Sequence, residues 1–144
     1  MTHRIEKTVV INAPAATVWE TLTQPHLMKQ WMGEEDLNLH IQTNWAVNSS
    51  ITISGFHHLA FVNKGTVLQF DPEKVLSYTS NSSLSNLPDK PGSYSILTFN
   101  LSSTEKQTIL TLTITNFPTE TIYKHHEFYW QSTMVLLKKF IEEK

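Results

Sequence analysis

The sequence predicts an α+β fold, in which an antiparallel sheet of about six to seven strands surrounds a long C-terminal helix. Two observations lead to this prediction. Between residues 37 and 117 most segments alternate apolar and polar residues or carry β-branched runs, and from Pro118 onward the apolar residues recur at helical spacing. A third observation is that two short helical segments, each marked by a proline, follow the first strand.

The first strand is expected at residues 5–11, because its apolar residues lie at even spacing. Pro14 suits the first turn of a helix, where its missing N–H costs nothing, and Pro25 starts a second short helix. Gly33 is expected to end that second helix. The residues expected on the buried faces are Ala15, Val18, Trp19 and Leu22 in the first helix, and Leu27, Met28 and Trp31 in the second.

Six further strand segments are expected, at residues 37–45, 49–58, 64–72, 74–80, 94–103 and 107–117. The last two form an antiparallel hairpin, since only the short segment 103–107 links them. The stretch 80–93 is rich in Ser, Asn and Pro and is predicted to be a loop.

The C-terminal helix is expected to begin after Thr119, which is a good N-cap, with Glu120 in its first turn. It should extend for about 24 residues, or roughly 36 Å. Its buried face is expected to carry Tyr123, Trp130, Met134, Leu137 and Ile141, at spacings of seven, four, three and four.

Composition narrows the classes of function. The chain has 144 residues, which suits a single domain over residues 1–144, and its net charge of −2 offers no basic field for nucleic acid. It has no cysteine, which excludes disulfides and thiolate chemistry. No apolar run reaches the about 18 residues of a membrane span, and the N-terminus lacks the apolar region of a signal peptide. We therefore expect a cytoplasmic protein.

Two pairs of adjacent histidines are candidate metal ligands. His57 and His58 should point to opposite faces of a strand, and His125 and His126 should lie about 100° apart around a helix axis. Neither pair can readily chelate one ion, so no metal site is predicted. The alternative that one histidine, His125 or His126, lies at the mouth of a cavity stays open.

No catalytic residues and no cofactor are predicted. Glu34, Glu35 and Asp36 form an acidic run directly after the expected helix end, which favours a solvated loop over a pair of catalytic carboxylates. The sequence contains no G-x-S-x-G, Walker or G-x-G-x-x-G motif, and its four glycines offer little for a phosphate-binding loop.

Four segments in this order resemble the Bet v 1-like (START-like, SRPBCC) superfamily, and within it the activator of Hsp90 ATPase homologue 1-like (AHSA1-like) family. They are "INAPAATVWETLTQPHLMKQWMG", "GTVLQFDPEKVLSYT", "YSILTFNL" and "WQSTMVLLKKFIEEK". The resemblance implies a helix-grip fold: a strongly curved sheet that grips the C-terminal helix around a cavity for an apolar or amphipathic small molecule. The family often has Gly before the Trp of the last helix, where this chain has Tyr129.

Aromatic side chains are the candidates for ligand contact. For most of them core packing and ligand contact stay open alternatives, because inward-facing residues of a curved sheet can both pack in the core and line a cavity. Trp19 is interpreted as a core residue. The Tyr78 hydroxyl and the Trp indole N–H groups would be polar handles in such a cavity. The predicted cavity residues are Trp31, Trp45, Tyr78, Phe99, Phe117, Trp130 and Met134.

Three functions follow as hypotheses. The first is a cytoplasmic protein that binds a hydrophobic or amphipathic small molecule. The second, implied by the family, is a chaperone-associated protein with Hsp90 as partner. The third is a cavity-based enzyme of the cyclase or hydrolase kind, for which the sequence offers no strong candidate group. The resemblance also implies a homodimer as an open alternative.

Overall fold

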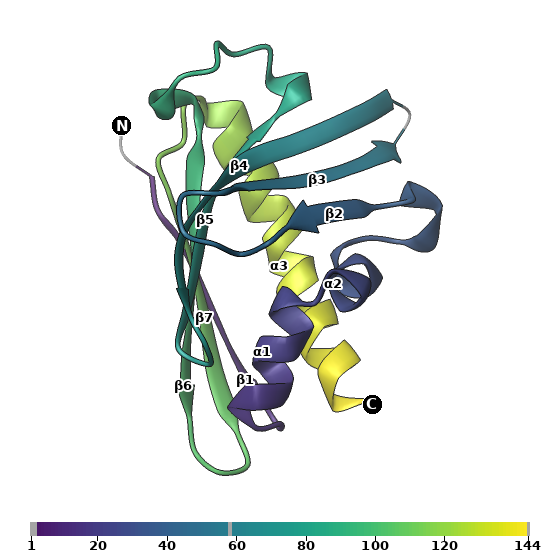
Figure 1. Cartoon of the computed structure of the whole chain (residues 1–144), viewed down its shortest axis with the longest axis vertical. Coiled ribbons are helices and arrows are strands. Elements are labelled where there is room, and N and C mark those ends of the chain that lie inside the picture. The colour runs from purple at the N-terminus through teal and green to yellow at the C-terminus, as the bar shows by residue number, and fades with distance from the viewer. Residues whose placement is uncertain (1–2, 58, 144) are drawn as a thin grey trace.

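The computed structural model describes residues 3–57 and 59–143, and the prediction for His57 and His58 falls on side chains outside this description. Three helices and seven strands form the domain (Figure 1). The helices are α1 (Ala15–Thr23), α2 (Pro25–Met32) and α3 (Glu120–Glu142). The strands are β1 (Ile5–Ile11), β2 (His40–Thr43), β3 (Ser50–His57), β4 (Leu59–Asp71), β5 (Val75–Ser82), β6 (Ser95–Ser103) and β7 (Thr108–Thr115).

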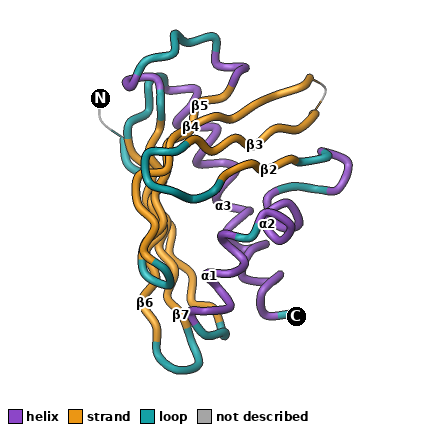
Figure 2. The backbone as a smooth tube through the Cα atoms, in the orientation of Figure 1, coloured by secondary structure: helices purple, strands orange, loops and turns teal. Residues whose placement is uncertain are grey.

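All seven strands belong to one antiparallel sheet in the order β1-β7-β6-β5-β4-β3-β2. The sheet bends strongly, so that β2, β3 and β4 project over α3 while β6 and β7 lie along its side (Figures 1 and 2). The short helices α1 and α2 lie at the lower part of the opening between sheet and α3. The predicted α+β helix-grip fold is therefore confirmed.

Helix α3 lies along β1, the edge strand of the sheet, and polar contacts join the two elements. Lys7 Nζ donates to Glu127 Oε1 at 2.6 Å, and the Asn12 backbone N–H donates to Glu142 Oε2 at 2.8 Å. The helix begins as predicted, because the Thr119 hydroxyl accepts a hydrogen bond of 3.1 Å from the Ile122 N–H. The contacts of Lys7 and Asn12 thus fix α3 against the sheet in its first half and at its C-terminal end.

Element boundaries differ from the predictions in several places. Pro14 is the N-cap of α1 rather than part of its first turn, whereas Pro25 does start α2 and Gly33 does end it. Strand β4 begins at Leu59, five residues earlier than expected, β5 ends at Ser82, two residues later than expected, and β2 covers only His40–Thr43 of the expected 37–45. The rest of the predicted 80–93 loop contains two short 3₁₀ turns, Ser83–Ser85 and Pro91–Ser93, and the acidic run forms a third, Glu35–Leu37.

The bend in the sheet depends on a close approach between β4 and β5 at Gly65. A Cβ atom at this position would lie 1.7 Å from the Thr79 carbonyl oxygen, so a larger residue cannot be placed here without moving the backbone. Just beyond, the pairing register shifts between Val67 and Gln69, as at a β-bulge, which increases local twist. The glycine and the shift together turn β2–β4 over the helix.

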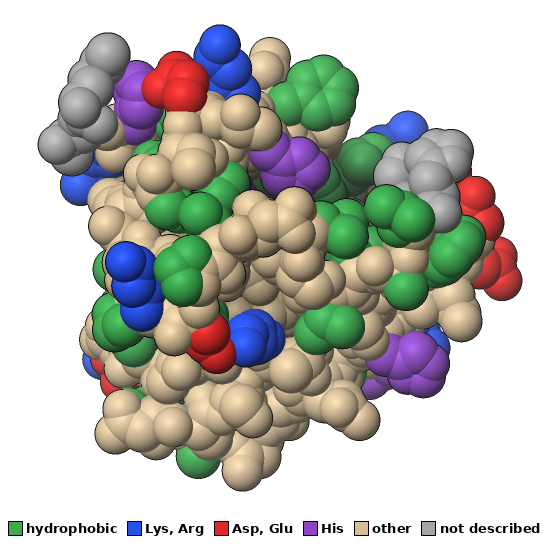
Figure 3. Space-filling model, turned by 90° about the horizontal axis from the view of Figure 1, so that it is seen from above, with side chains coloured by type: hydrophobic (Ala, Val, Ile, Leu, Met, Phe, Trp, Pro, Cys, Tyr) green, Lys and Arg blue, Asp and Glu red, His purple; other side chains and the backbone are tan. Residues whose placement is uncertain are grey.

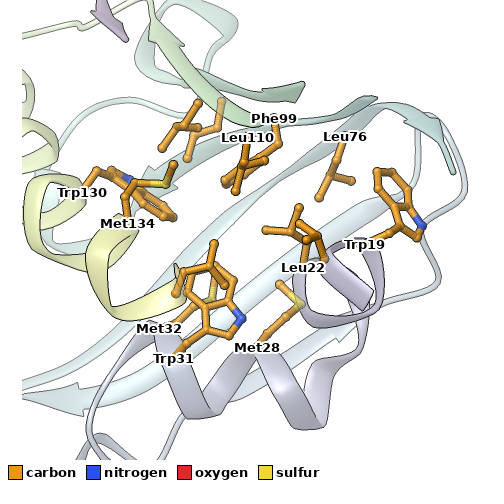
Figure 4. Close-up of a cluster of buried hydrophobic side chains, with 14 of the residues drawn as sticks. Trp19, Leu22, Met28, Trp31, Met32, Leu76, Phe99, Leu110, Trp130 and Met134 are labelled. Carbon is orange, nitrogen blue, oxygen red and sulfur yellow. The ribbon is translucent and has the colours of Figure 1, made fainter. Parts of the chain in front are cut away.

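The core fills the space between the sheet and the helices (Figure 4). Side chains from α1, α2 and α3 point toward side chains from β5, β6 and β7. Burying each large apolar side chain contributes about 1.5–3 kcal/mol, so this cluster dominates the stability of the domain. The labelled members are Trp19, Leu22, Met28, Trp31, Met32, Leu76, Phe99, Leu110, Trp130 and Met134.

None of the helices within residues 3–57 and 59–143 has both the length and the apolar character needed to cross a bilayer.

Candidate functional site

Most of the predicted cavity residues meet in a row of aromatic rings between the sheet and α3. Trp31 of α2 packs against Trp130 of α3, with ring centroids 6.3 Å apart. Trp130 meets Phe99 of β6 edge-on at 5.8 Å, and Phe99 stacks near Tyr78 of β5 at 6.4 Å. All four side chains are buried, so the row is an interior feature that crosses from the helices to the sheet.

The row continues on the other side of Tyr78 through the loop between β2 and β3. The Trp45 ring lies 6.2 Å from that of Tyr78 and stacks on Phe70 of β4 at 5.6 Å, and Phe70 meets Trp19 of α1 at 5.1 Å. Trp45 has a φ of 59°, a left-handed conformation that is unusual for a bulky residue. The contacts of its ring hold it in this strained backbone.

Two tryptophan N–H groups are already used by the backbone of α1. Trp31 Nε1 donates to the Thr21 carbonyl at 2.9 Å, and Trp45 Nε1 donates to the Thr23 carbonyl at 2.7 Å. These carbonyls lie in the last turn of α1, where intrahelical partners run out. The indoles of Trp31 and Trp45 therefore link the aromatic row to α1. Their N–H groups are already hydrogen-bonded, whereas the sequence analysis expected them to be available to a ligand.

Two other donors in the row have no such bond. Within residues 3–57 and 59–143, neither the Tyr78 hydroxyl nor the Trp130 indole N–H has a hydrogen-bond partner, although both side chains are only 3% exposed. No fully enclosed polar side-chain atom of these residues lacks a partner, so the small accessible part of each side chain includes its donor. Both rings contact Phe99, Tyr78 from β5 of the sheet and Trp130 from α3.

Tyr129 connects α3 to α2. Its hydroxyl donates a hydrogen bond to the carbonyl of Met32, the last residue of α2. Burial raises the pKa of Tyr129 to about 12, and the nearby Thr133 hydroxyl opposes this shift. Burial also raises the pKa of Tyr78, with a further contribution from Tyr129, so both phenols stay protonated at neutral pH. The Tyr129 side chain thus joins α3 to α2, at the position where the resemblance implies a frequent Gly.

Phe117 lies apart from the row, near the N-terminal end of α3. Its ring meets Tyr123 edge-on at 5.1 Å and lies 5.9 Å from His126. Burial lowers the pKa of His126 to about 4, and neighbouring His125 adds to the effect, so His126 is neutral at pH 7. Of the two histidines left open by the sequence, His126 is half-buried and His125 is exposed.

The buried polar side chains around this interior are all uncharged. Among the described residues every buried side chain with a polar group is Ser, Thr, Asn, Tyr or Trp, and the Lys, Arg, Asp and Glu side chains all lie at the surface or partly exposed.

On the face of the molecule seen from above, hydrophobic side chains gather over the half where the β3–β4 hairpin projects, and lysine and arginine side chains lie scattered (Figure 3). Exposed members of the hairpin include Phe56, Leu59 and Val62.

Two hollows lie outside the row. One of about 560 Å³ lies beside the end of α2 and is lined by Lys29, Gln30, Gly33, Glu34, Glu35, Asn38, Leu39 and Phe140. The other, of about 290 Å³, is lined by polar residues of β2, β3 and their loop. None of the seven predicted cavity residues lines either hollow. Ligand contact by those seven residues stays a prediction.

The structure thus places five of the seven predicted residues in the buried core, and the other two, Trp45 and Phe117, are partly buried and pack against it. Phe70 was missed because strict alternation in its predicted strand places it on the same face as exposed Leu68, and the register shift between Val67 and Gln69 interrupts this alternation. Phe70 matters because it joins Trp19 to Trp45.

Comparisons with known proteins agree with this architecture. The sequence model of the family described as "Activator of Hsp90 ATPase homolog 1-like protein" matches residues 12–142. No curated protein shows significant similarity. Among solved structures, ChR145 from Cytophaga hutchinsonii is 34% identical, with 98% of this chain and 94% of that chain covered and a TM-score of 0.80.

Two more distant structures share the fold. CV1439 from Chromobacterium violaceum is 17% identical, with 96% of each chain covered and a TM-score of 0.82. The Aha1 dimer from Colwellia psychrerythraea is 21% identical, with 97% of this chain and 96% of that chain covered and a TM-score of 0.75. At these identities the likeness concerns the fold alone.

Proposed function

Because this chain belongs to the family of activator of Hsp90 ATPase homolog 1-like proteins, whose fold is of a ligand-binding type, we propose that it binds a hydrophobic or amphipathic small molecule between the sheet and α3. The proposal rests chiefly on one observation: Tyr78 and Trp130 present unpaired donors inside an aromatic interior. Small-molecule sites typically combine apolar walls with a few such polar groups.

The energetic reason for this proposal is the hydrogen bond that each unpaired donor can form with a ligand. Each donor keeps a small accessible area, so an acceptor on a bound molecule can form a hydrogen bond with it, which contributes about 0.5–1.5 kcal/mol. Rings around Phe99 would at the same time cover the apolar part of that molecule. A ligand enters this site by displacing ring contacts, so we expect binding to be coupled to movement of α2 or of the Trp45 loop.

Titration of the ¹⁵N-labelled protein with 2-naphthol, followed by ¹H–¹⁵N spectra, tests the proposal. We expect shifts centred on β5, β6 and the middle of α3, around Tyr78, Phe99 and Trp130. Shifts confined to the outer hollow beside Glu34 and Phe140, or none at all, would contradict binding in the interior. Residues 104–107 serve as an internal reference because they form the exposed turn between β6 and β7.

A chaperone-associated role is supported only by the description of the family, and no feature of the described residues favours it. An enzymatic role has one candidate group, His126, which is neutral at pH 7 and has no buried carboxylate beside it among the described residues. We therefore place small-molecule binding ahead of both. A cytoplasmic location stays a prediction.

The homodimer is a separate proposal, for which the outer face of α3 is the candidate surface. Phe128 is 80% exposed, and Val135, two turns further on, and Leu136 are also exposed. Such a stripe on a helix is typical of an interface, and a structural neighbour is described as a dimer. Sedimentation of the wild type and of Phe128→Glu tests this: we expect a dimer and a monomer respectively, and a monomeric wild type would contradict it.

A further inference from the structure

The chemistry of the interior limits which molecules it can hold. The two donors near Phe99 come from an uncharged phenol and an uncharged indole, and the buried side chains of the described residues include no lysine or arginine. Lys7 and Lys138, the partly buried lysines, are paired with Glu127 and Glu142 on the outside of α3. An anionic group inside would therefore lack a cation as partner.

We propose that the interior selects uncharged molecules with an apolar body and one hydroxyl or carbonyl oxygen, which accepts hydrogen bonds from the Tyr78 hydroxyl and the Trp130 indole N–H. This inference rests on the proposed function, since it names the class of ligand for the same site. A carbonyl oxygen has two lone pairs and can accept from both donors. A hydroxyl can accept as well and can also donate to the Tyr78 oxygen.

Carboxylates are selected against by desolvation. An ionised group moved from water into an apolar interior without a counter-charge loses several kcal/mol, which two neutral donors do not restore. The titratable groups nearest the row do not provide that charge, because the phenols of Tyr78 and Tyr129 are never cationic and the lowered pKa of His126 keeps it neutral at pH 7. A pure hydrocarbon avoids this cost, but it leaves both donors unpaired.

Three matched probes test the inference: naphthalene, 2-naphthol and 2-naphthoate, titrated into the full chain at pH 7. They share one ring system and differ in the group that meets the donors. We expect 2-naphthol to bind about fivefold tighter than naphthalene and at least about tenfold tighter than 2-naphthoate. Tyr78→Phe should remove most of the advantage of 2-naphthol over naphthalene, whereas Tyr123→Phe, a tyrosine outside the row, should leave it unchanged.

The outcomes separate the inference from the proposed function. If 2-naphthoate binds as tightly as 2-naphthol, or if Tyr78→Phe leaves the order of affinities intact, the interior does not select uncharged oxygen-bearing ligands, although it binds apolar molecules. If none of the three probes binds, the proposed function itself fails. The wild-type comparison alone is decisive, so the test holds even where a variant folds poorly.

Discussion

The Trp31 indole donates a hydrogen bond of 2.9 Å to the backbone carbonyl of Thr21. In an uninterrupted helix this carbonyl would accept from the N–H four residues later, but that residue is Pro25, which has none. The chain also turns at Gln24, which has extended backbone angles. Trp31 therefore supplies the donor that the α1–α2 junction lacks, and its partner is buried.

Trp31→Phe is expected to lower the free energy of unfolding by about 2–4 kcal/mol, because it removes ring volume and also leaves a buried carbonyl unpaired. Trp19→Phe is the matched control: Trp19 is buried, and its indole N–H has no hydrogen-bond partner among the described residues. We expect that control to cost about half as much. Urea unfolding measures both, and equal losses would show that the Thr21 bond contributes nothing.

Gly65→Ala is expected to destabilise the fold by more than about 3 kcal/mol or to prevent folding, since the new methyl would overlap the Thr79 carbonyl at 1.7 Å. Gly92→Ala is the control, because a Cβ there meets no atom within 4 Å. It should change stability by no more than about 0.5 kcal/mol. Unfolding midpoints report the difference, and a Gly65→Ala protein of wild-type stability would refute the close approach of β4 and β5.

His126 should make stability depend on pH. Its pKa is about 4 in the folded chain and about 6.5 when unfolded. Between these values the unfolded chain binds more protons, so stability should fall as pH drops from about 6.5 to 4, by at most about 3 kcal/mol. His126→Gln should lose this slope, and His125→Gln, at an exposed position, should largely retain it. Urea unfolding across this range measures the slope, and an unchanged slope in His126→Gln would assign it to other groups.

Tyr129→Phe is expected to loosen α2, because the Met32 carbonyl loses its hydrogen bond from α3. The loss should be about 1 kcal/mol, and backbone amides at Trp31, Met32 and Gly33 should exchange with solvent faster. Tyr123→Phe is the control, since the Tyr123 hydroxyl has no partner among the described residues. Hydrogen exchange measured by mass spectrometry compares the two, and unchanged exchange in α2 would contradict a connecting role for Tyr129.

Sequence reasoning predicted the fold more completely than the site. The apolar periods of β6, β7 and α3, the proline at the start of α2 and the Thr119 cap are local signals, and the structure contains each of them. The early start of β4 was missed because Leu59–Asn63 does not alternate apolar and polar residues and gains its strand structure from pairing with β3.

The site could be predicted only as a set of inward aromatic residues. Which donors are free depends on contacts between distant segments: Trp45 reaches Thr23 across 22 positions, and Tyr129 reaches Met32 across 97. No spacing in the sequence indicates that the indoles of Trp31 and Trp45 are bonded while that of Trp130 is not. The same limit applies to the pKa of His126, which results from burial against residues brought together by the fold.

The most direct test of binding between the sheet and α3 is the tryptophan indole region of the ¹H–¹⁵N spectrum during titration with 2-naphthol. Trp→Phe variants assign its signals. We predict that the Nε1–H signal of Trp130 moves downfield, as a newly hydrogen-bonded N–H does, and that those of Trp31 and Trp45 move less, because their bonds to Thr21 and Thr23 already exist. A Trp130 signal that stays in place at saturating 2-naphthol would contradict the account.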